Sequence, residues 1–533
     1  MPTKFLLAML LGSPLVLCSA SAERVIEADL AREKGPMNRM YNFCVGAGRA
    51  NEGLRADWQR QLKVVREECG FRYIRFHGLF CDDMGVYFEN RQGQPIYNWQ
   101  YIDELFDSLL SIGLKPFIEI GFMPSGLASG SQTIFWYRGN VTPPKDYAKW
   151  EAFIAAFTRH CTERYGSEEV RSWYFEVWNE PNLDGFWMGN PEKKTFEQWA
   201  PAARAEYLKL YTTTARAVKS VDAAYRVGGP ATAGEGWIDE TLTFCAEQNV
   251  PLDFISTHNY ATMSGYLDEY GNAGTVLAPD RNAISSGVKN VRERMNRSKF
   301  AKAQLHYTEW SASYTPSDPI HDGFESAAFI LDKMKNIGSA ADSMSYWTFT
   351  DIFEEAGPRY AAFHGGFGLL NYQDLKKPAF FAYKFLHQLG DIELQTADAA
   401  AFACKDASGG VQVLFWDFTI THPGPSMNNQ EYYLTERPAK PQPAATVRLS
   451  KLAPGSYRVT GYKVGYRSND VQAAWRDMGS PAQLSKDQVA TLRKASAGAP
   501  SFEETIEVRA DGTFSRSFEM RENDVWLVKL SRI

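Results

Sequence analysis

The sequence predicts an α/β fold in which a (β/α)8 TIM barrel is followed by a C-terminal accessory β-sandwich domain. The first observation is that strand-like runs, rich in aromatic and β-branched residues, alternate eight times with runs of helical period between Tyr41 and Leu389. The second is that from about Asp391 onward short strands separated by turns replace this alternation. The third is length, because 533 residues are more than one domain usually holds.

Eight parallel strands are expected to close the barrel, each followed by a segment of helical period such as 58–65 or 379–386. The expected strands are Tyr41–Val45, Tyr73–Phe76, Lys115–Ile120, Trp173–Trp178, Tyr225–Gly228, Phe254–Thr257, Gln304–Thr308 and Ser343–Thr348. A doubly wound open sheet is the alternative, and it typically has a Gly-rich phosphate turn after its first strand. Gly46-Ala47-Gly48 matches only part of that fingerprint, which favours the barrel.

The chain divides into four predicted segments. They are a signal peptide at residues 1–22, an N-terminal strand at 23–37 that pairs with the β-sandwich, the barrel at 38–390, and the accessory β-sandwich at 391–533. The strand at 23–37 is assigned to the sandwich because Arg24–Asp29 looks extended and precedes the barrel.

The first residues have the pattern of a secretory signal. Lys4 supplies a positive start, 5–17 form an apolar core too short to span a bilayer, and Ala20-Ser21-Ala22 is a small-residue cleavage site. Cys18 would allow a lipoprotein, but the bulky Leu17 stands before it where a small residue is expected. The predicted location is therefore secreted or periplasmic.

Charge and cysteine usage narrow the possible partners. The net charge is −6 without a basic block, so an oligosaccharide substrate is favoured over nucleic acid or a membrane surface, and no membrane span is expected. The cysteines beyond the signal lack CxxC spacing, so we expect buried free thiols, although a disulfide remains an alternative in an oxidising compartment. No His/Cys/Asp cluster has metal spacing, so no cofactor is expected, and the sequence sets no oligomeric state.

Two carboxylates stand where predicted strands end. Glu180, in Trp178-Asn179-Glu180-Pro181, ends strand four, and Glu309, in Thr308-Glu309-Trp310, ends strand seven. The C-terminal ends of barrel strands meet at one face, where active sites are built. One carboxylic acid that protonates a leaving oxygen and one carboxylate that attacks are what glycosidic cleavage needs. Two unrelated glutamates in solvated loops are the alternative, but the neighbouring tryptophans suit a sugar and would raise the pKa of the acid.

Several ordered segments resemble glycoside hydrolase family 39, whose best-known members are β-xylosidases and α-L-iduronidases, and most of all its bacterial β-xylosidases. The segments are 71–78 (FRYIRFHG), 82–85 (DDMG), 178–182 (WNEPN), 254–260 (FISTHNY), 308–310 (TEW), 351–355 (DIFEE) and 363–368 (FHGGFG), with 458–462 (RVTGY) similar to the family's accessory domain. The resemblance implies a retaining double displacement with Glu180 as acid/base and Glu309 as nucleophile. Retention requires the two carboxyl groups about 5–5.5 Å apart.

Polar residues on the same strand tips are candidate contacts. Asn179 is expected to bond the sugar 2-hydroxyl, with a loop cap as the alternative. Arg75 is expected to support Glu309, although an Arg in a barrel end is also commonly a structural ion-pair member. The resemblance places His77 and His258 among the sugar-hydroxyl ligands, whereas a lone His is more often a core residue.

Aromatic and loop residues complete the predicted site. Tyr260 is expected to bond Glu309 or the sugar, and Trp310 and Trp347 are candidate stacking platforms, with plain core as the alternative. Of the adjacent pair Glu354 and Glu355 in the loop after strand eight, we expect Glu354 to accept hydrogen bonds from ring hydroxyls.

These patterns favour a retaining exo-glycosidase that hydrolyses β-1,4-linked xylose from the non-reducing ends of xylo-oligosaccharides. An arabinosidase or α-L-iduronidase on the same machinery is one alternative, and a non-catalytic carbohydrate-binding barrel is another. The family's uronide readers show basic residues after the strand-six histidine, whereas Asn259 and Tyr260 follow His258, which counts against a uronide.

Overall fold

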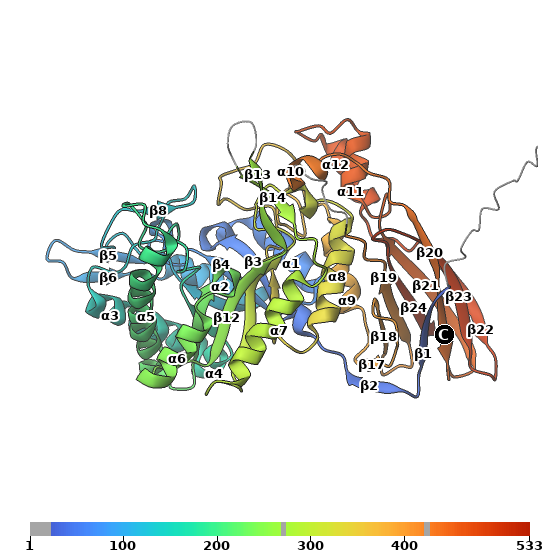
Figure 1. The fold of residues 1–533 in the computed structure, drawn as a ribbon, viewed down its shortest axis with the longest axis horizontal. Helices are drawn as coiled ribbons and strands as arrows, with labels where there is room; N and C mark the ends of the chain where they lie inside the picture. Colours follow the sequence, from blue (N-terminus) through green and yellow to red (C-terminus); the bar gives the residue numbers. More distant parts are fainter. Residues whose placement is uncertain (1–22, 268–272, 421–426) are drawn as a thin grey trace, which may run out of the picture.

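The computed structural model describes residues 23–267, 273–420 and 427–533, so the predicted signal peptide lies outside the described residues. Figure 1 shows a barrel surrounded by helices and, beside it, the C-terminal strands. Within the described segments, no helix is long and apolar enough to cross a membrane.

Eight parallel strands close into a barrel whose order follows the chain, and β16 returns to pair with β3, which confirms the predicted fold class. The strands are β3 (Cys44–Arg49), β4 (Tyr73–His77), β7 (Lys115–Ile120), β10 (Tyr174–Val177), β11 (Arg226–Thr232), β12 (Phe254–Tyr260), β15 (Gln304–Ser311) and β16 (Ser343–Tyr346).

The first strand begins later than predicted. Residues Met40–Asn42 form the 3-10 turn η1 in place of the start of a strand. Tyr41 is buried there, and its hydroxyl donates to the carbonyl of Leu386 at 2.8 Å. Its aromatic character therefore reflects packing against the end of a helix, which a strand-propensity argument cannot distinguish from a place in the sheet.

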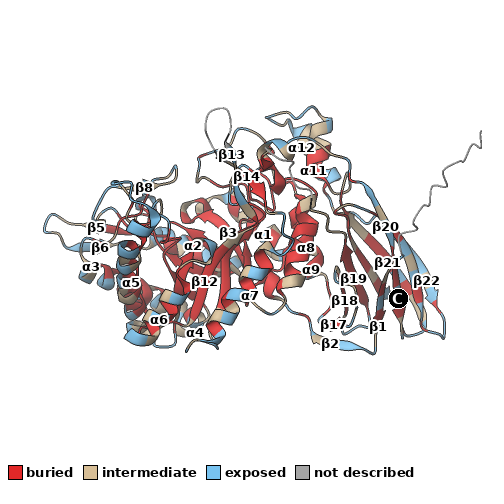
Figure 2. Ribbon diagram, viewed as in Figure 1, coloured by how far each residue is buried: buried red, intermediate tan, exposed pale blue. Residues whose placement is uncertain are grey.

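The helices surround the barrel with their buried faces inward and their exposed faces outward (Figure 2). They are α1 (Ala56–Cys69), α2 (Gln100–Ile112), α3 (Tyr147–Tyr165), α4 (Ser167–Arg171), α5 (Phe196–Val221), α6 (Ile238–Gln248), α7 (Ala283–Asn296), α8 (Glu325–Ile337) and α9 (Pro378–His387). In α2 the buried residues Ile102, Leu105, Phe106 and Leu109 follow helical spacing, and the helix ends at Gly113 in the left-handed conformation with φ 88°.

Short elements extend the loops between strands and helices. They are the 3-10 turns η2 (Ala50–Leu54), η3 (Asp82–Met84), η4 (Ala233–Glu235) and η5 (Pro319–His321), and the paired strands β5 (Tyr87–Glu89) with β6 (Pro95–Tyr97), β8 (Thr133–Ile134) with β9 (Gly139–Asn140), and β13 (Thr262–Leu267) with β14 (Ala273–Leu277). The β13–β14 hairpin continues from β12 beyond the barrel mouth (Figure 1).

Two sheets make up the accessory domain and share one apolar core that includes Ile26, Val413, Val447 and Val528. The smaller sheet has the order β1 (Arg24–Asp29), β20 (Pro441–Ser450), β23 (Phe514–Arg521). The larger has the order β2 (Glu33–Pro36), β17 (Ile392–Leu394), β18 (Ala401–Lys405), β19 (Val411–Trp416), β24 (Val525–Arg532), β21 (Gly455–Val464), β22 (Phe502–Val508). The N-terminal segment thus contributes one strand to each sheet.

Three short helices belong to the C-terminal region: α10 (Asn429–Tyr432), α11 (Val471–Asp477) and α12 (Lys486–Ala495). Of these, α10 lies beside the β13–β14 hairpin (Figure 1), and α11 packs against α12. The described cysteines, Cys44, Cys69, Cys81, Cys161, Cys245 and Cys404, are all free and buried.

Candidate active site

The structure brings Glu180 and Glu309 together at the C-terminal mouth of the barrel. Glu180 follows β10, and its backbone N–H donates to the carbonyl of Ala231 on the adjacent strand at 2.8 Å. Glu309 lies near the C-terminal end of β15. Both line a cavity of about 570 Å³, and an oxygen of each lies within 4.8 Å of the other. This separation suits a retaining pair, because inverting enzymes leave about 6.5–9.5 Å for a water molecule.

The Glu309 carboxylate is held from two sides. Arg75, fully buried, donates to one oxygen, and the Tyr260 hydroxyl donates to the other at 2.7 Å. The same guanidinium donates to Glu176 at 2.8 Å and to the Asn179 side-chain oxygen at 2.8 Å. Charge-assisted hydrogen bonds of this kind fix orientation, so Glu309 presents a preset oxygen to the cavity. Because Arg75 occupies the Asn179 oxygen and Asn179 lines the cavity, its amide N–H groups can donate to a sugar hydroxyl.

Glu180 is arranged to hold a proton. Burial raises its pKa to about 7, against partial opposition from His77 and Arg75. His258 Nδ1 lies 2.8 Å from a Glu180 oxygen, and its Nε2 lies 3.1 Å from the Thr308 hydroxyl. That hydroxyl donates its single proton to Glu176 at 2.7 Å.

The protonation state of His258 follows from this chain of contacts. Burial lowers the pKa of His258 to about 4, so the ring is neutral and carries one proton. Because Thr308 has already used its proton, Nε2 must be the donor and Nδ1 the acceptor. The proton between Nδ1 and Glu180 therefore belongs to Glu180. This arrangement favours the carboxylic acid form that a general acid requires.

The most buried part of the cavity carries a cationic histidine and a second acid. Burial acts to lower the pKa of His77, but Glu119, 2.6 Å from Nδ1, raises it to about 10. Nε2 of His77 lies 3.4 Å from Glu355, whose own pKa burial raises to about 7. Trp347 lies against His77 with ring centroids 4.8 Å apart and also lines the cavity. These groups form a floor with polar edges suited to a sugar ring.

Of the residues predicted from sequence, the cavity is lined by His77, Asn179, Glu180, Tyr260, Glu309 and Trp347. Arg75 lies directly beneath them. His258 is fully buried and contacts Glu180, so the structure places it behind the acid, where it does not reach the sugar. This corrects its predicted place among the substrate ligands.

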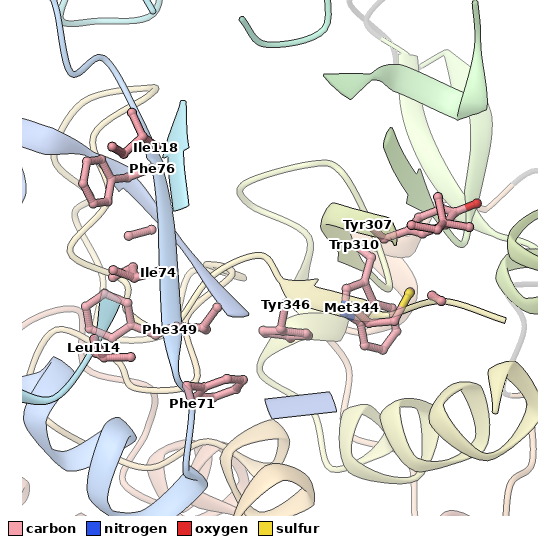
Figure 3. Packing of buried hydrophobic residues seen from close by; sticks show 14 of the residues in the cluster. Phe71, Ile74, Phe76, Leu114, Ile118, Tyr307, Trp310, Met344, Tyr346 and Phe349 are labelled. Atoms are coloured by element: carbon pink, nitrogen blue, oxygen red, sulfur yellow. The ribbon is translucent and has the colours of Figure 1, made fainter. Parts of the chain in front are cut away.

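Trp310 was wrongly predicted as a stacking platform. It is fully buried, with its ring against Phe329 of α8 and against Tyr346, which Figure 3 shows beside it. Successive side chains of a strand point to opposite faces, so the inward position of Glu309 directs Trp310 outward, into the layer between β15 and α8. Its role is packing.

Glu354 also lies elsewhere than predicted. It forms ion pairs with Arg49 at 2.9 Å and Arg55 at 3.2 Å, and its neighbour Glu355 enters the cavity. The backbone N–H of Glu354 donates to the buried Glu52 at 2.9 Å, which fixes this turn of the loop. The two basic side chains come from the first strand and the turn after it, so they select which of the adjacent acids faces outward.

The sequence argument left several site residues without a role: Glu119, Phe135, Glu176, Thr308 and Glu355. Glu119 and Glu176 are neighbours across the β7–β10 pairing and point into the barrel. The sequence did contain a signal for these two residues, since each is an acidic residue inside an apolar strand. A buried charge needs a partner, so both could have been expected to pair with a basic group inside the barrel.

Within the part of the chain that the structure describes, Glu180, His258 and Glu309 are the set of ligand atoms close enough to hold a metal ion. Of these, His258 and Glu180 share a hydrogen bond, and Glu309 is paired with the Arg75 guanidinium. A fixed positive charge at this distance opposes a cation, so the donor set is better suited to acid–base chemistry.

A family model described as glycosyl hydrolases family 39 matches residues 24–515. The chain belongs to this family. The family 39 protein is 39% identical to a β-xylosidase of Geobacillus stearothermophilus over 512 residues, which are 94% of each chain. It matches the crystal structure of a monomeric β-xylosidase from Caulobacter crescentus CB15 with a TM-score of 0.90 and 42% identity, covering 96% of this chain and all of that one.

The relationship to iduronidases is more distant. Human α-L-iduronidase is 27% identical over 282 residues, which are 49% of this chain and 39% of the human enzyme. Together with the retaining geometry, family membership identifies this chain as a glycoside hydrolase.

Proposed function

We propose that this family 39 enzyme is an exo-acting, retaining β-xylosidase that releases β-1,4-linked xylose from the non-reducing ends of xylo-oligosaccharides. The observation that carries the proposal is the close pair of Glu180 and Glu309 in one cavity, with an acid on one side and an Arg-bound carboxylate on the other. Its similarity to β-xylosidases along nearly the whole chain supports xylose as the sugar.

The first step forms a covalent intermediate. Glu180 gives its proton to the glycosidic oxygen while a Glu309 oxygen attacks the anomeric carbon, so the C–O bond to the leaving group breaks as the bond to Glu309 forms. In the second step the ionised Glu180 takes a proton from water, and the resulting hydroxide displaces Glu309 from the anomeric carbon. Two inversions leave the configuration retained.

The charge of the cavity supports a neutral sugar over a uronide. Its described lining contains Glu180, Glu309 and Glu355 with His77 as the cation, and neither Lys nor Arg is present among those residues. His77 is already paired with Glu119 and Glu355. A uronate carboxylate would enter an acid-rich site without a free cation, which disfavours iduronate.

The test is a comparison of nitrophenyl β-D-xylopyranoside, α-L-arabinopyranoside, α-L-arabinofuranoside and α-L-iduronide, with the anomer of the first product followed by NMR. We expect the xyloside to have the highest kcat/KM and β-xylose to appear first. Glu309→Ala should abolish turnover, because it removes the carboxylate that Arg75 and Tyr260 hold in place to attack the anomeric carbon. Faster arabinoside turnover would replace the substrate assignment, and full activity of Glu309→Ala, or binding without cleavage by the wild type, would refute the mechanism.

We also propose that the chain is exported to the periplasm or beyond. The support is the signal pattern of residues 1–22, which lie outside the described residues. Mass spectrometry of the protein recovered from the periplasmic and extracellular fractions should find Glu23 as its first residue.

A further inference from the structure

The β13–β14 hairpin forms part of the open side of the active-site cavity. Thr262, its first residue, lines the cavity, and Met263 and Tyr266 expose 49% and 46% of their surface. Tyr314, which follows the adjacent strand β15, also lines the cavity and is 48% exposed, and its ring contacts Tyr260 with centroids 6.3 Å apart. His77 and Trp347 are almost fully buried, whereas Met263, Tyr266 and Tyr314 are about half exposed. An exo-enzyme would therefore hold its first sugar near His77 and Trp347 and the next sugar toward the exposed residues.

The accessory domain holds the hairpin with three consecutive side-chain amides. Asn428 accepts from the backbone N–H of Tyr266 at 2.7 Å and donates to its carbonyl at 2.9 Å. Gln430 accepts from the N–H of Thr275 at 3.1 Å and donates to its hydroxyl at 2.8 Å. Asn429 accepts from the N–H of Leu277 at 2.9 Å. Side chains thus satisfy backbone groups that another strand would normally satisfy.

The fit of Asn428 depends on two glycines of the hairpin. A Cβ at Gly274 would lie 2.4 Å from the Asn428 side-chain amide, and a Cβ at Gly265 would lie 2.2 Å from its oxygen. The Asn428 side chain therefore occupies the space that side chains at these positions would take. The hairpin can accept the Asn428 side chain only because both positions are glycine.

One of the three residues, Asn429, also reaches the loop that carries Tyr314. Asn429, fully buried, donates to the Asp318 carboxylate at 2.8 Å, and the Thr275 hydroxyl donates to the same oxygen at 2.9 Å. The hairpin and the Tyr314 loop are thereby tied to one short segment of the C-terminal region, more than 100 residues away in the chain.

We propose that Asn428, Asn429 and Gln430 are positioning residues for the leaving-group side of the site, so that the accessory domain sets the affinity for substrate sugars beyond the first. This inference rests on the proposed xylosidase function and extends it to the aglycone. The three residues contact neither Glu180 nor Glu309. They act on the site through the hairpin and the Tyr314 loop.

The test separates the two ends of the cavity. In Asn428→Ala, KM for xylotetraose should rise about fivefold, since the loss of side-chain hydrogen bonds worth about 1 kcal/mol corresponds to that factor. The inhibition constant of xylose, which needs only the most buried part of the cavity, and kcat should stay within about twofold. Gly274→Ala should raise the same KM, because its methyl group displaces Asn428.

Two controls distinguish positioning from a general loss of stability. Arg493→Ala removes a different contact between the C-terminal region and the barrel, to the Gln373 carbonyl at 3.3 Å, and should leave KM unchanged. The double variant Asn428→Ala/Gly274→Ala should be no worse than either single one, because the collision needs the Asn428 amide.

Wild-type and variant results separate the two claims. An unchanged ratio of the xylotetraose KM to the xylose inhibition constant in both single variants would overturn the inference while leaving an active xylosidase. An equal rise in the xylotetraose KM and in the xylose inhibition constant would also overturn the inference, because the effect would then not be confined to the leaving-group side. A wild type that releases no xylose would instead refute the proposed function, and this inference with it.

Discussion

Replacing Thr308 with Val tests whether the hydrogen-bond chain behind Glu180 controls its proton. The variant keeps the shape of the fully buried side chain but removes the hydroxyl that donates to Glu176 and accepts from His258. His258 Nε2 then loses its acceptor, and the ring can place its proton on Nδ1, where it donates to Glu180. A donor to the carboxylate favours its ionised form, so the pKa of Glu180 should fall.

The size of the effect follows from the strength of that contact. A hydrogen bond to a charged group contributes about 1.5–3 kcal/mol, and one pKa unit corresponds to about 1.4 kcal/mol. The wild-type pKa of Glu180 is about 7, so that of the variant should lie about 1–2 units lower. The first step needs protonated Glu180, and kcat/KM should therefore begin to fall at correspondingly lower pH.

The assay is the pH dependence of kcat/KM with a nitrophenyl xyloside, because its basic limb reports the acid in the free enzyme. Thr308→Ser restores the hydroxyl and should return the limb to the wild-type position. A merely structural role predicts a uniform decrease at every pH together with a lower Tm. If Thr308→Val kept the wild-type basic limb, the tautomer assigned to His258 would be wrong.

Three further predictions concern neighbouring positions. Glu355→Gln should raise KM for xylosides because its contact with His77 weakens. Glu354→Gln breaks the largely buried ion pairs with Arg49 and Arg55, so it should lower the free energy of unfolding by about 1–3 kcal/mol and leave KM unchanged; equal kinetic effects of the two variants would contradict this. Trp310→Ala should cost about 3–5 kcal/mol in denaturant unfolding while the folded enzyme keeps its KM; a selective rise in KM would show that the tryptophan contacts substrate. Lys377→Met should also cost about 3–5 kcal/mol, because it leaves buried aspartates at 2.6 and 2.7 Å from the ammonium unpaired, and an unchanged Tm would refute that reasoning.

Much of the barrel could be predicted because it follows from local patterns in the sequence. Apolar runs of strand length followed by helical periods recur eight times, and parallel strands place all their C-terminal ends on one face. That rule alone predicts that Glu180 and Glu309, at the ends of strands four and seven, can converge. The start of the first strand was missed because Tyr41 packs against the end of a helix remote in the chain.

The errors within the site have different origins. The outward direction of Trp310 could have been predicted from the sequence. Neighbouring residues of a strand point to opposite faces, so Trp310 must point outward if Glu309 points into the barrel. The choice between Glu354 and Glu355 was not, because loop residues have no period and the deciding partners, Arg49 and Arg55, lie some 300 residues earlier.

The sequence by itself determined the barrel, the two carboxylates and the face on which they meet, because strand periodicity and chain order are local properties. Only the tertiary structure decided which nitrogen of His258 faces Glu180, which acid enters the cavity, and that Asn428 holds the hairpin. Those features depend on the distances and directions of partners that are far apart in the chain, and such geometry exists only once the chain has folded.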